Sequence, residues 1–325
     1  MADLGLAQSF SLVALNAQDS LHRTAAKTVA LRAMAAAVLL EAYLNGAFAK
    51  DGDALVLQKE ASSIPYRDAV LRPLLKKGGE TGDLGQWLKK ASALPNRQFK
   101  VFEQAMAASL DALDLLDEIP NLLGCDLYYD SAGVKIKEYR SDMMEYARIT
   151  ETIRAEILED GPVTDEAICM LWLLRESGCM HDLFSQNELE KVAFRMNVLY
   201  QSNALAKALF PVRFHQGIEI AIKSFLRMKK AAVKTQFGTG VNFVFPFLER
   251  SQSIFIDTEA WFSNAEKRLH DVKVRLESNG HIFTVLREGE TPLIKIDNIV
   301  YVAIPHAVYT RIPIQGVRLR PSRPI

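Results

Sequence analysis

The fold is decided by the stretch Val29-Ala-Leu-Arg-Ala-Met-Ala-Ala-Ala-Val-Leu-Leu-Glu-Ala-Tyr-Leu44, which is apolar on almost every side of a helix. Asn45-Gly46 follows it, a typical helix end. A helix without a polar face is typical of the middle of a bundle. We therefore expect buried side chains at Met34, Val38, Leu39 and Leu40. We also expect Glu41 to be paired or to lie at the protein surface, because an isolated buried carboxylate is costly.

The composition is that of an ordinary globular protein. Of 325 residues, 49% are hydrophobic and 24% are charged, which argues against disorder. Lys plus Arg and Asp plus Glu each number 39, so the net charge is zero, which argues against nucleic acid as a partner. No stretch has the ~20 mostly uncharged apolar residues of a membrane span. Because Met1 to Phe10 also lack a basic residue, we expect a cytoplasmic protein that can attach peripherally to a membrane.

The cysteines and the known motifs indicate neither a metal site nor an active site. Cys125, Cys169 and Cys179 are too few for a disulfide framework and form no CxxC pair. Cys169 and Cys179 lie near His181, but a fourth zinc ligand is missing, so we expect Cys169 to be a core thiol. The sequence also contains no phosphate-binding loop, no GxSxG and no HExxH. It therefore predicts no catalytic residue, no metal and no cofactor.

The first two-thirds of the chain has a helical pattern. After the first helix, which runs from Asp19 or Ser20 to Leu44, we expect helices at 65–76, 84–91, 96–116, 142–158, 164–176 and 185–209. Ser185 and Glu188 have the spacing of a capping box, in which each side chain satisfies the other's free backbone amide. A short strand is expected at 54–58 and a β-hairpin at 126–136.

After about Lys234 the pattern changes to strands. We expect one amphipathic helix at 257–278, strands at 281–287 and 293–304, and an extended tail at the proline- and arginine-rich end, 311–325. This change places a boundary near residue 235, between a helical domain 1–234 and a small domain 235–325. The expected fold class is mainly α: a helical bundle around a central buried helix with a β-hairpin, plus a small C-terminal α+β domain.

The zero net charge conceals two regions of opposite charge. Residues 101–134 carry seven acids and no Lys or Arg, whereas residues 211–234 carry six bases and one acid. Five of these bases fall in one stripe of a helix at ~100° per residue. The stripe consists of Arg213, Lys223, Arg227, Lys230 and Lys234. Such a stripe can lie on an anionic membrane, dock on an acidic partner or a second copy of the chain, or merely face water.

Short motifs within residues 4–205 resemble the Golgi phosphoprotein 3 family of peripheral membrane proteins. The segments that carry the resemblance are Leu39–Phe48, Ala54–Leu57, Asp68–Leu71, Trp87–Leu88, Ser109–Leu116, Val163–Thr164, Leu171–Leu174 and Leu183–Ser185. The resemblance implies a mainly helical fold with a protruding β-hairpin. It also implies non-enzymatic binding of a phosphorylated inositol lipid and, in the eukaryotic members, retention of glycosyltransferases by their cytosolic tails.

The lipid pocket of that family uses a tryptophan and three arginines, and little of it carries over. The corresponding positions hold Ala26, Ala35, Lys100 and Glu103, of which Lys100 alone keeps the charge. The bases nearby in sequence, which are candidates to replace the lost donors, are Lys27, Arg32 and Arg97. Phosphate recognition usually needs several charge-assisted donors, so we expect weak headgroup selectivity.

The predicted function is therefore non-enzymatic binding, similar to that of phosphatidylinositol-phosphate-binding peripheral membrane adaptors. The predicted partner is an anionic membrane or a protein, with self-association through the acidic and basic regions as a further interaction. The alternative is a hydrolase or transferase whose site has no recognisable motif. A pocket of convergent groups with perturbed pKa values would favour that alternative.

Overall fold

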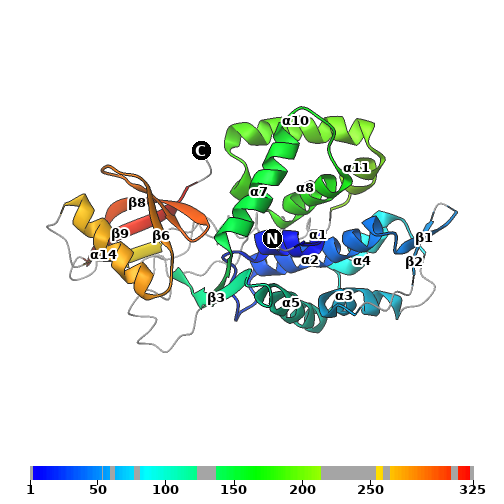
Figure 1. Cartoon of the computed structure of the whole chain (residues 1–325), viewed down its shortest axis with the longest axis horizontal. Helices are drawn as coiled ribbons and strands as arrows, with labels where there is room; N and C mark the ends of the chain where they lie inside the picture. Colours follow the sequence, from blue (N-terminus) through cyan, green and yellow to red (C-terminus); the bar gives the residue numbers. More distant parts are fainter. Residues whose placement is uncertain are drawn as a thin grey trace, which may run out of the picture. The chain divides into compact units, whose positions relative to one another are not determined.

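The computed structural model describes residues 3–52, 54–58, 63–76, 81–122, 137–213, 254–258, 264–308 and 314–322, which divide into two compact units (Figure 1). Unit 1 comprises Met1–Leu15, Thr28–Leu116 and Met144–Glu219. Unit 2 comprises Asn16–Lys27, Asp117–Met143 and Ile220–Ile325. Each unit is assembled from three separate segments of chain. The boundary expected near residue 235 lies outside the described residues.

The helix that the apolar stretch predicts is α2 (Ala25–Leu44). Its expected core side chains are all buried, with Met34, Leu39 and Leu40 fully buried and Val38 1% exposed. The prediction of a central buried helix is therefore confirmed. A second buried helix of unit 1, α1 (Leu6–Leu15), was not expected from the sequence. Neither of these helices, nor any other that the structure describes, is long and apolar enough to cross a lipid bilayer.

The carboxylate of Glu41 is buried on α2 and is paired, as expected. Its Oε1 lies 2.8 Å from both Nε and Nη2 of Arg67, and its Oε2 accepts from the backbone N–H of Ala7 at 2.9 Å. Gly5 approaches this carboxylate so closely that a Cβ at residue 5 would clash with it. The ion pair and the amide together offset the cost of removing Glu41 from water.

The remaining helices of unit 1 follow the predicted order. They are α3 (Pro65–Leu75), α4 (Leu84–Ser92), α5 (Asn96–Asp111), α7 (Met143–Leu158), α8 (Asp165–Ser177), α9 (Met180–Leu183), α10 (Gln186–Ser202) and α11 (Ala204–Leu209). α5 ends earlier than expected, because the chain turns at Asp114 with a left-handed φ of 57°. The expected strand at 54–58 is β2 (Ala54–Leu57), which pairs antiparallel with β1 (Phe48–Asp51).

The predicted capping box is present at the start of α10. Glu188 Oε2 accepts from the amide of Ser185 at 2.8 Å, and Ser185 Oγ accepts from the amide of Glu188 at 3.4 Å. Glu188 Oε1 also accepts from Arg154 Nη2 on α7 at 2.6 Å. Burial favours a higher pKa for Glu188, but the hydrogen bonds from Ser185 and Arg154 outweigh it and lower the pKa of this carboxyl.

We expect Glu188→Gln to lower the free energy of unfolding by about 1.5–3 kcal/mol at neutral pH, the usual range for hydrogen bonds to charged groups. Because the folded-state pKa is lowered, this stability is present above the unfolded pKa of ~4.3 and is lost as the pH falls through the folded value. Urea unfolding at several pH values should therefore show a difference from wild type that closes in acid. Glu190→Gln, at an exposed position of the same helix, is the control, and an equal effect there would contradict the prediction.

Unit 2 contains a five-stranded antiparallel sheet in the order β5-β9-β8-β7-β6. Its strands are β5 (Ile254–Asp257), β6 (Phe283–Arg287), β7 (Leu293–Ile296), β8 (Ile299–Val308) and β9 (Ile314–Pro321). The helix α14 (Ala265–Ser278) lies beside this sheet (Figure 1). Its buried Val272 and Leu276 belong to the core of the sheet. The expected strand at 293–304 is two strands, because Asp297 turns the chain with a left-handed φ of 53°.

The end of the chain is part of the sheet, so the prediction of an extended tail at 311–325 is wrong. β9 pairs with β5 on one side and with β8 on the other. Val317 and Leu319 are buried, whereas Arg320 is exposed. This alternation is that of a strand with one buried face. The inward-facing apolar residues decide the structure here, even though arginines alternate with them.

Two earlier segments also belong to unit 2. Strand β3 (Leu116–Pro120) pairs with β4 (Lys137–Ser141), while the expected hairpin at 126–136 lies outside the described residues. Residues 17–20 run beside β4, because Ala17 N–H donates to Tyr139 O at 2.8 Å and Ser20 N–H donates to Lys137 O at 2.9 Å.

The strand content corrects the expected fold class. Of the residues that the structure describes, 56% are helical and 20% are in strands, and they include a five-stranded antiparallel sheet as well as hairpins. The protein is therefore mixed α/β and not mainly a helical bundle. The helical periodicity of the first two-thirds was a poor guide to the class of the whole protein, because the five-stranded sheet is formed by strands from the last third of the chain.

Candidate functional site

Lys27, a predicted anion ligand, is engaged by the backbone of its own unit. It is 2% exposed, and its Nζ donates to the carbonyl oxygens of Asp19, Ser20 and His22 at 2.7, 3.3 and 3.0 Å. An ammonium group has three hydrogens to donate. Lys27 therefore stabilises the loop before α2 and has no hydrogen left for a phosphate.

Three of the family's pocket positions are buried in this structure. Ala26 and Ala35 are buried on α2, and Glu103 is buried on α5. Arg32 is half-buried, and its Nε is buried without a hydrogen-bond partner among the described residues. Lys27 and Arg32 are five residues apart, or ~140° around a helix with ~100° per residue, so they face different sides.

Two exposed bases of α5 closely follow, along the chain, two lysines at the end of α4. A short connection links the two helices, and no acidic residue lies between Asp83 and Glu103. We call these four bases the α4–α5 basic patch: Lys89, Lys90, Arg97 and Lys100. All are exposed except the half-buried Lys90. Sequence reasoning found the α5 half of this patch and missed the α4 half.

Packing holds the two helices of the patch in place. Lys90 Nζ lies 4.7 Å from the centre of the Trp87 ring, which is itself 2% exposed. Gln98 Nε2 donates to Ala69 O at 2.7 Å and so ties α5 to α3, beside which it lies in Figure 1. Val101, 48% exposed, adds an apolar side chain next to the bases of α5.

The predicted basic stripe lies mostly outside the described residues. Arg213 is described and exposed, whereas Lys223, Arg227, Lys230 and Lys234 are not described. In the acidic region, Asp117 lies 3.0 Å from Arg140 and Glu118 lies 3.8 Å from Lys137. Both of these acids are thus paired with bases of β4. An interaction between the stripe and the acidic region stays a prediction.

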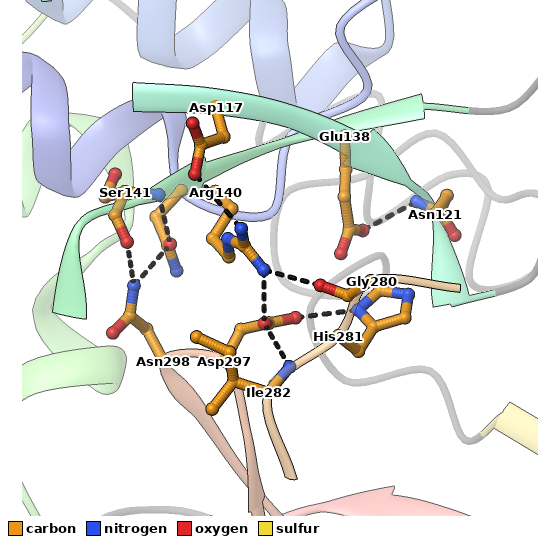
Figure 2. A network of polar contacts seen from close by, with 11 residues as sticks. Asp117, Asn121, Glu138, Arg140, Ser141, Gly280, His281, Ile282, Asp297 and Asn298 are labelled. Atoms are coloured by element: carbon orange, nitrogen blue, oxygen red, sulfur yellow. Dashed lines mark hydrogen bonds and ion pairs between the residues drawn. The ribbon is translucent and has the colours of Figure 1, made fainter. Parts of the chain in front are cut away.

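A group of buried titratable side chains in unit 2 was not predicted (Figure 2). Glu138 lies on β4, His281 follows α14, and Asp297 lies between β7 and β8. They are 7%, 3% and 7% exposed, and each offers one atom within 4.8 Å of the other two. Glu138 is more than a hundred residues from the other two, so no local motif in the sequence indicated this group.

Hydrogen bonds orient all three side chains. His281 Nδ1 lies 2.8 Å from Asp297 Oδ2, and Asp297 Oδ1 accepts from the backbone N–H of Ile282 at 3.1 Å. Glu138 Oε2 accepts from Asn121 Nδ2 at 2.8 Å. The other ring nitrogen of His281, Nε2, is buried and has no hydrogen-bond partner in the part of the chain that the structure describes.

Arg140 joins this group to the surrounding backbone. Its Nη1 donates to Gly280 O at 2.7 Å and lies 3.5 Å from Asp297 Oδ1. Its Nη2 donates to Asp117 Oδ2 at 3.0 Å. Figure 2 shows the guanidinium between the two carboxylates, with its contact on the Oδ1 side of Asp297. The Oδ2 atom is therefore left to His281.

The electrostatics of the group favour either protonation or a bound cation. Burial raises the pKa of Glu138 to about 8, with the charges of Asp297 and Asp19 adding to the effect and Arg140 opposing it. Burial also raises the pKa of Tyr301, as do the charges of Glu138 and Asp297. A carboxylate in such surroundings is stable when it is neutralised.

A small hollow adjoins the group. Glu138, Asp297 and Tyr301 are among its lining residues, and it has room for about one water molecule. The hollow can therefore hold a water or a single ion and is too small for an organic substrate.

The two described cysteines are core residues. Cys169 and Cys179 are fully buried free thiols. Burial raises the pKa of Cys169, with the charges of Asp165 and Glu166 adding to the effect. The prediction of a core thiol at Cys169 is confirmed.

A comparison of the chain with known protein families and with curated proteins finds no match. The resemblance drawn from short motifs therefore stays a prediction, and the function has to be inferred from geometry and charge.

Proposed function

We propose that this protein is a non-enzymatic binding protein that docks on an anionic lipid surface through the α4–α5 basic patch. The observation that carries the proposal is the charge of two connected helices, which bear four bases and no acid between Asp83 and Glu103. Three of these bases are exposed, so their charges are available to a surface.

Surface electrostatics sets the strength of this docking. Each base near an anionic membrane contributes about 1 kcal/mol. Val101 can add a small apolar contact, since it is exposed beside Lys100. Charges at a surface are screened over ~8–10 Å, so binding should weaken steeply with salt. With Lys27 engaged by carbonyl groups and Glu103 buried, selectivity for one inositol phosphate is expected to be weak.

The test is sedimentation with vesicles of neutral lipid, alone or mixed with phosphatidylserine or a phosphoinositide. We expect binding to the anionic vesicles only. The double variant Arg97→Glu and Lys100→Glu should weaken it by more than about 2 kcal/mol, or roughly 30-fold, because two attractive charges become repulsive. Headgroup-selective binding that resists salt would contradict the surface mechanism.

The matched control is the double variant Lys191→Glu and Lys207→Glu, which changes the net charge equally at exposed positions of α10 and α11. It should bind anionic vesicles nearly as well as wild type. An equal loss in both double variants would show that net charge and not the α4–α5 basic patch controls binding. Unchanged binding in the patch variant would overturn the proposal.

A further inference from the structure

The buried group in unit 2 has the composition of a transition-metal site. Glu138, His281 and Asp297 supply one imidazole and two carboxylates, with ligand atoms all within 4.8 Å of one another. His281 Nδ1 and Asp297 Oδ2 are 2.8 Å apart. Two ligands at ~2.1 Å from one ion and at right angles lie ~3 Å apart, so this spacing suits neighbouring ligands.

The surroundings of these side chains resemble the second layer around a metal. Ligating carboxylates are usually hydrogen-bonded themselves, and a ligating histidine usually gives its other ring nitrogen to a carboxylate. Here Asn121 holds Glu138, and the amide of Ile282 holds the far oxygen of Asp297. The rotamers of the group are thus set before any ion arrives.

The second ring nitrogen of His281 is buried as well. The Nε2 atom of His281 is buried, lacks a partner among the described residues, and belongs to a side chain that is 0% exposed. A buried polar atom without a partner costs about 1–3 kcal/mol. For all three residues to bind one ion, the ion takes the place of the proton between His281 Nδ1 and Asp297 Oδ2, and Nε2 then carries the hydrogen of the ring.

The acidic side chains around the group also favour binding of a cation. Glu138 and Asp297 face each other, with Asp117 and Asp19 nearby, and Arg140 is the described base in contact with Asp297. We propose that Glu138, His281 and Asp297 bind one divalent first-row transition-metal ion, with Zn²⁺ or Mn²⁺ as the class of ligand. Imidazole suits zinc and carboxylates suit manganese, and all three residue types are known zinc ligands.

Such an ion would be structural. The adjoining hollow has room for about one water, which can complete the coordination but cannot be replaced by an organic substrate. The three ligands lie on β4, before β6 and between β7 and β8. One ion would therefore join β4 to the five-stranded sheet within unit 2. This inference is independent of the proposed lipid binding, which uses other residues.

The test uses the full chain, stripped with a chelator and titrated with Zn²⁺ and with Mn²⁺ against a chromophoric competitor. We expect wild type to bind one equivalent of Zn²⁺ or Mn²⁺ tightly and to melt at a higher temperature with the ion, because the ion binds the folded state. Glu138→Gln and His281→Asn should each weaken binding roughly 10–100-fold or more. Both substitutions keep a polar group of similar shape, and circular dichroism checks that each variant folds.

The control is His270→Asn, which removes an exposed histidine of α14 and should leave the affinity unchanged. Zinc-edge X-ray absorption of wild type gives an answer even if a variant fails to fold. A shell of nitrogen and oxygen with one imidazole would support the proposal, and a sulfur-containing shell would place the ion at a cysteine and overturn it. Failure of stripped wild type to bind either ion, or binding that survives in both ligand variants, would also overturn it.

Discussion

Ending the chain after Val308 is expected to unfold the five-stranded sheet of unit 2. The truncation removes β9, which lies between β5 and β8 and pairs with both. Without it, β5 loses its partner strand, and the core loses the buried side chains of Val317 and Leu319. Hydrogen exchange should therefore speed up by orders of magnitude in β5 and β8, because protection there depends on the intact sheet.

A pair of point variants tests the contribution of side-chain packing in β9 to stability without shortening the chain. Leu319→Ala removes a fully buried side chain and should cost about 2–5 kcal/mol. Its neighbour Arg320 is exposed, and Arg320→Ala should change stability by about 0.5 kcal/mol or less. If the truncated chain kept wild-type protection from hydrogen exchange in β5 and β8, the conclusion that β9 lies between these two strands would be wrong.

The second large effect is expected in α2. Leu39→Ala should lower the free energy of unfolding by about 2–5 kcal/mol, because Leu39 is fully buried and its truncation leaves a cavity. Tryptophan fluorescence during urea unfolding is a suitable measurement, since Trp87 and Trp172 are both buried in unit 1.

Leu44→Ala is the matched control for that variant. It makes the same chemical change on the same helix, at a residue that is 36% exposed, so less apolar surface returns to water. The cost should be clearly smaller than at Leu39. Equal costs at the two positions would mean that α2 is not packed as a central helix.

Local sequence patterns were sufficient to predict the elements that have one strong periodicity or a clear cap. The apolar stretch of α2 predicted its burial, and it also predicted that Glu41 would need a partner, although not that Arg67 would be that partner. Ser185 and Glu188 predicted the start of α10, because a capping box forms within one helical turn. These features depend on neighbours a few residues away, which a sequence displays directly.

The sequence also carried a signal for β9 that was outweighed by composition. Val317 and Leu319 alternate with Arg318 and Arg320, which is the pattern of a half-buried strand. Prolines and arginines at the chain end favoured an extended tail instead. Which interpretation holds depends on whether a sheet offers an open edge, and β5 and β8 supply those edges from other parts of the chain.

By itself, then, the sequence determined the buried helix and the capping box at the start of α10, because each follows from residues within a few turns of one another. Only the tertiary structure showed what Lys27 binds: its ammonium group donates to backbone carbonyl oxygens of the loop before α2. Only the tertiary structure brought Glu138, His281 and Asp297 together. The physical reason is that hydrogen bonding and charge pairing act over a few ångströms in space. In the sequence, more than a hundred residues and several helices separate Glu138 from His281, and β6 and β7 separate His281 from Asp297.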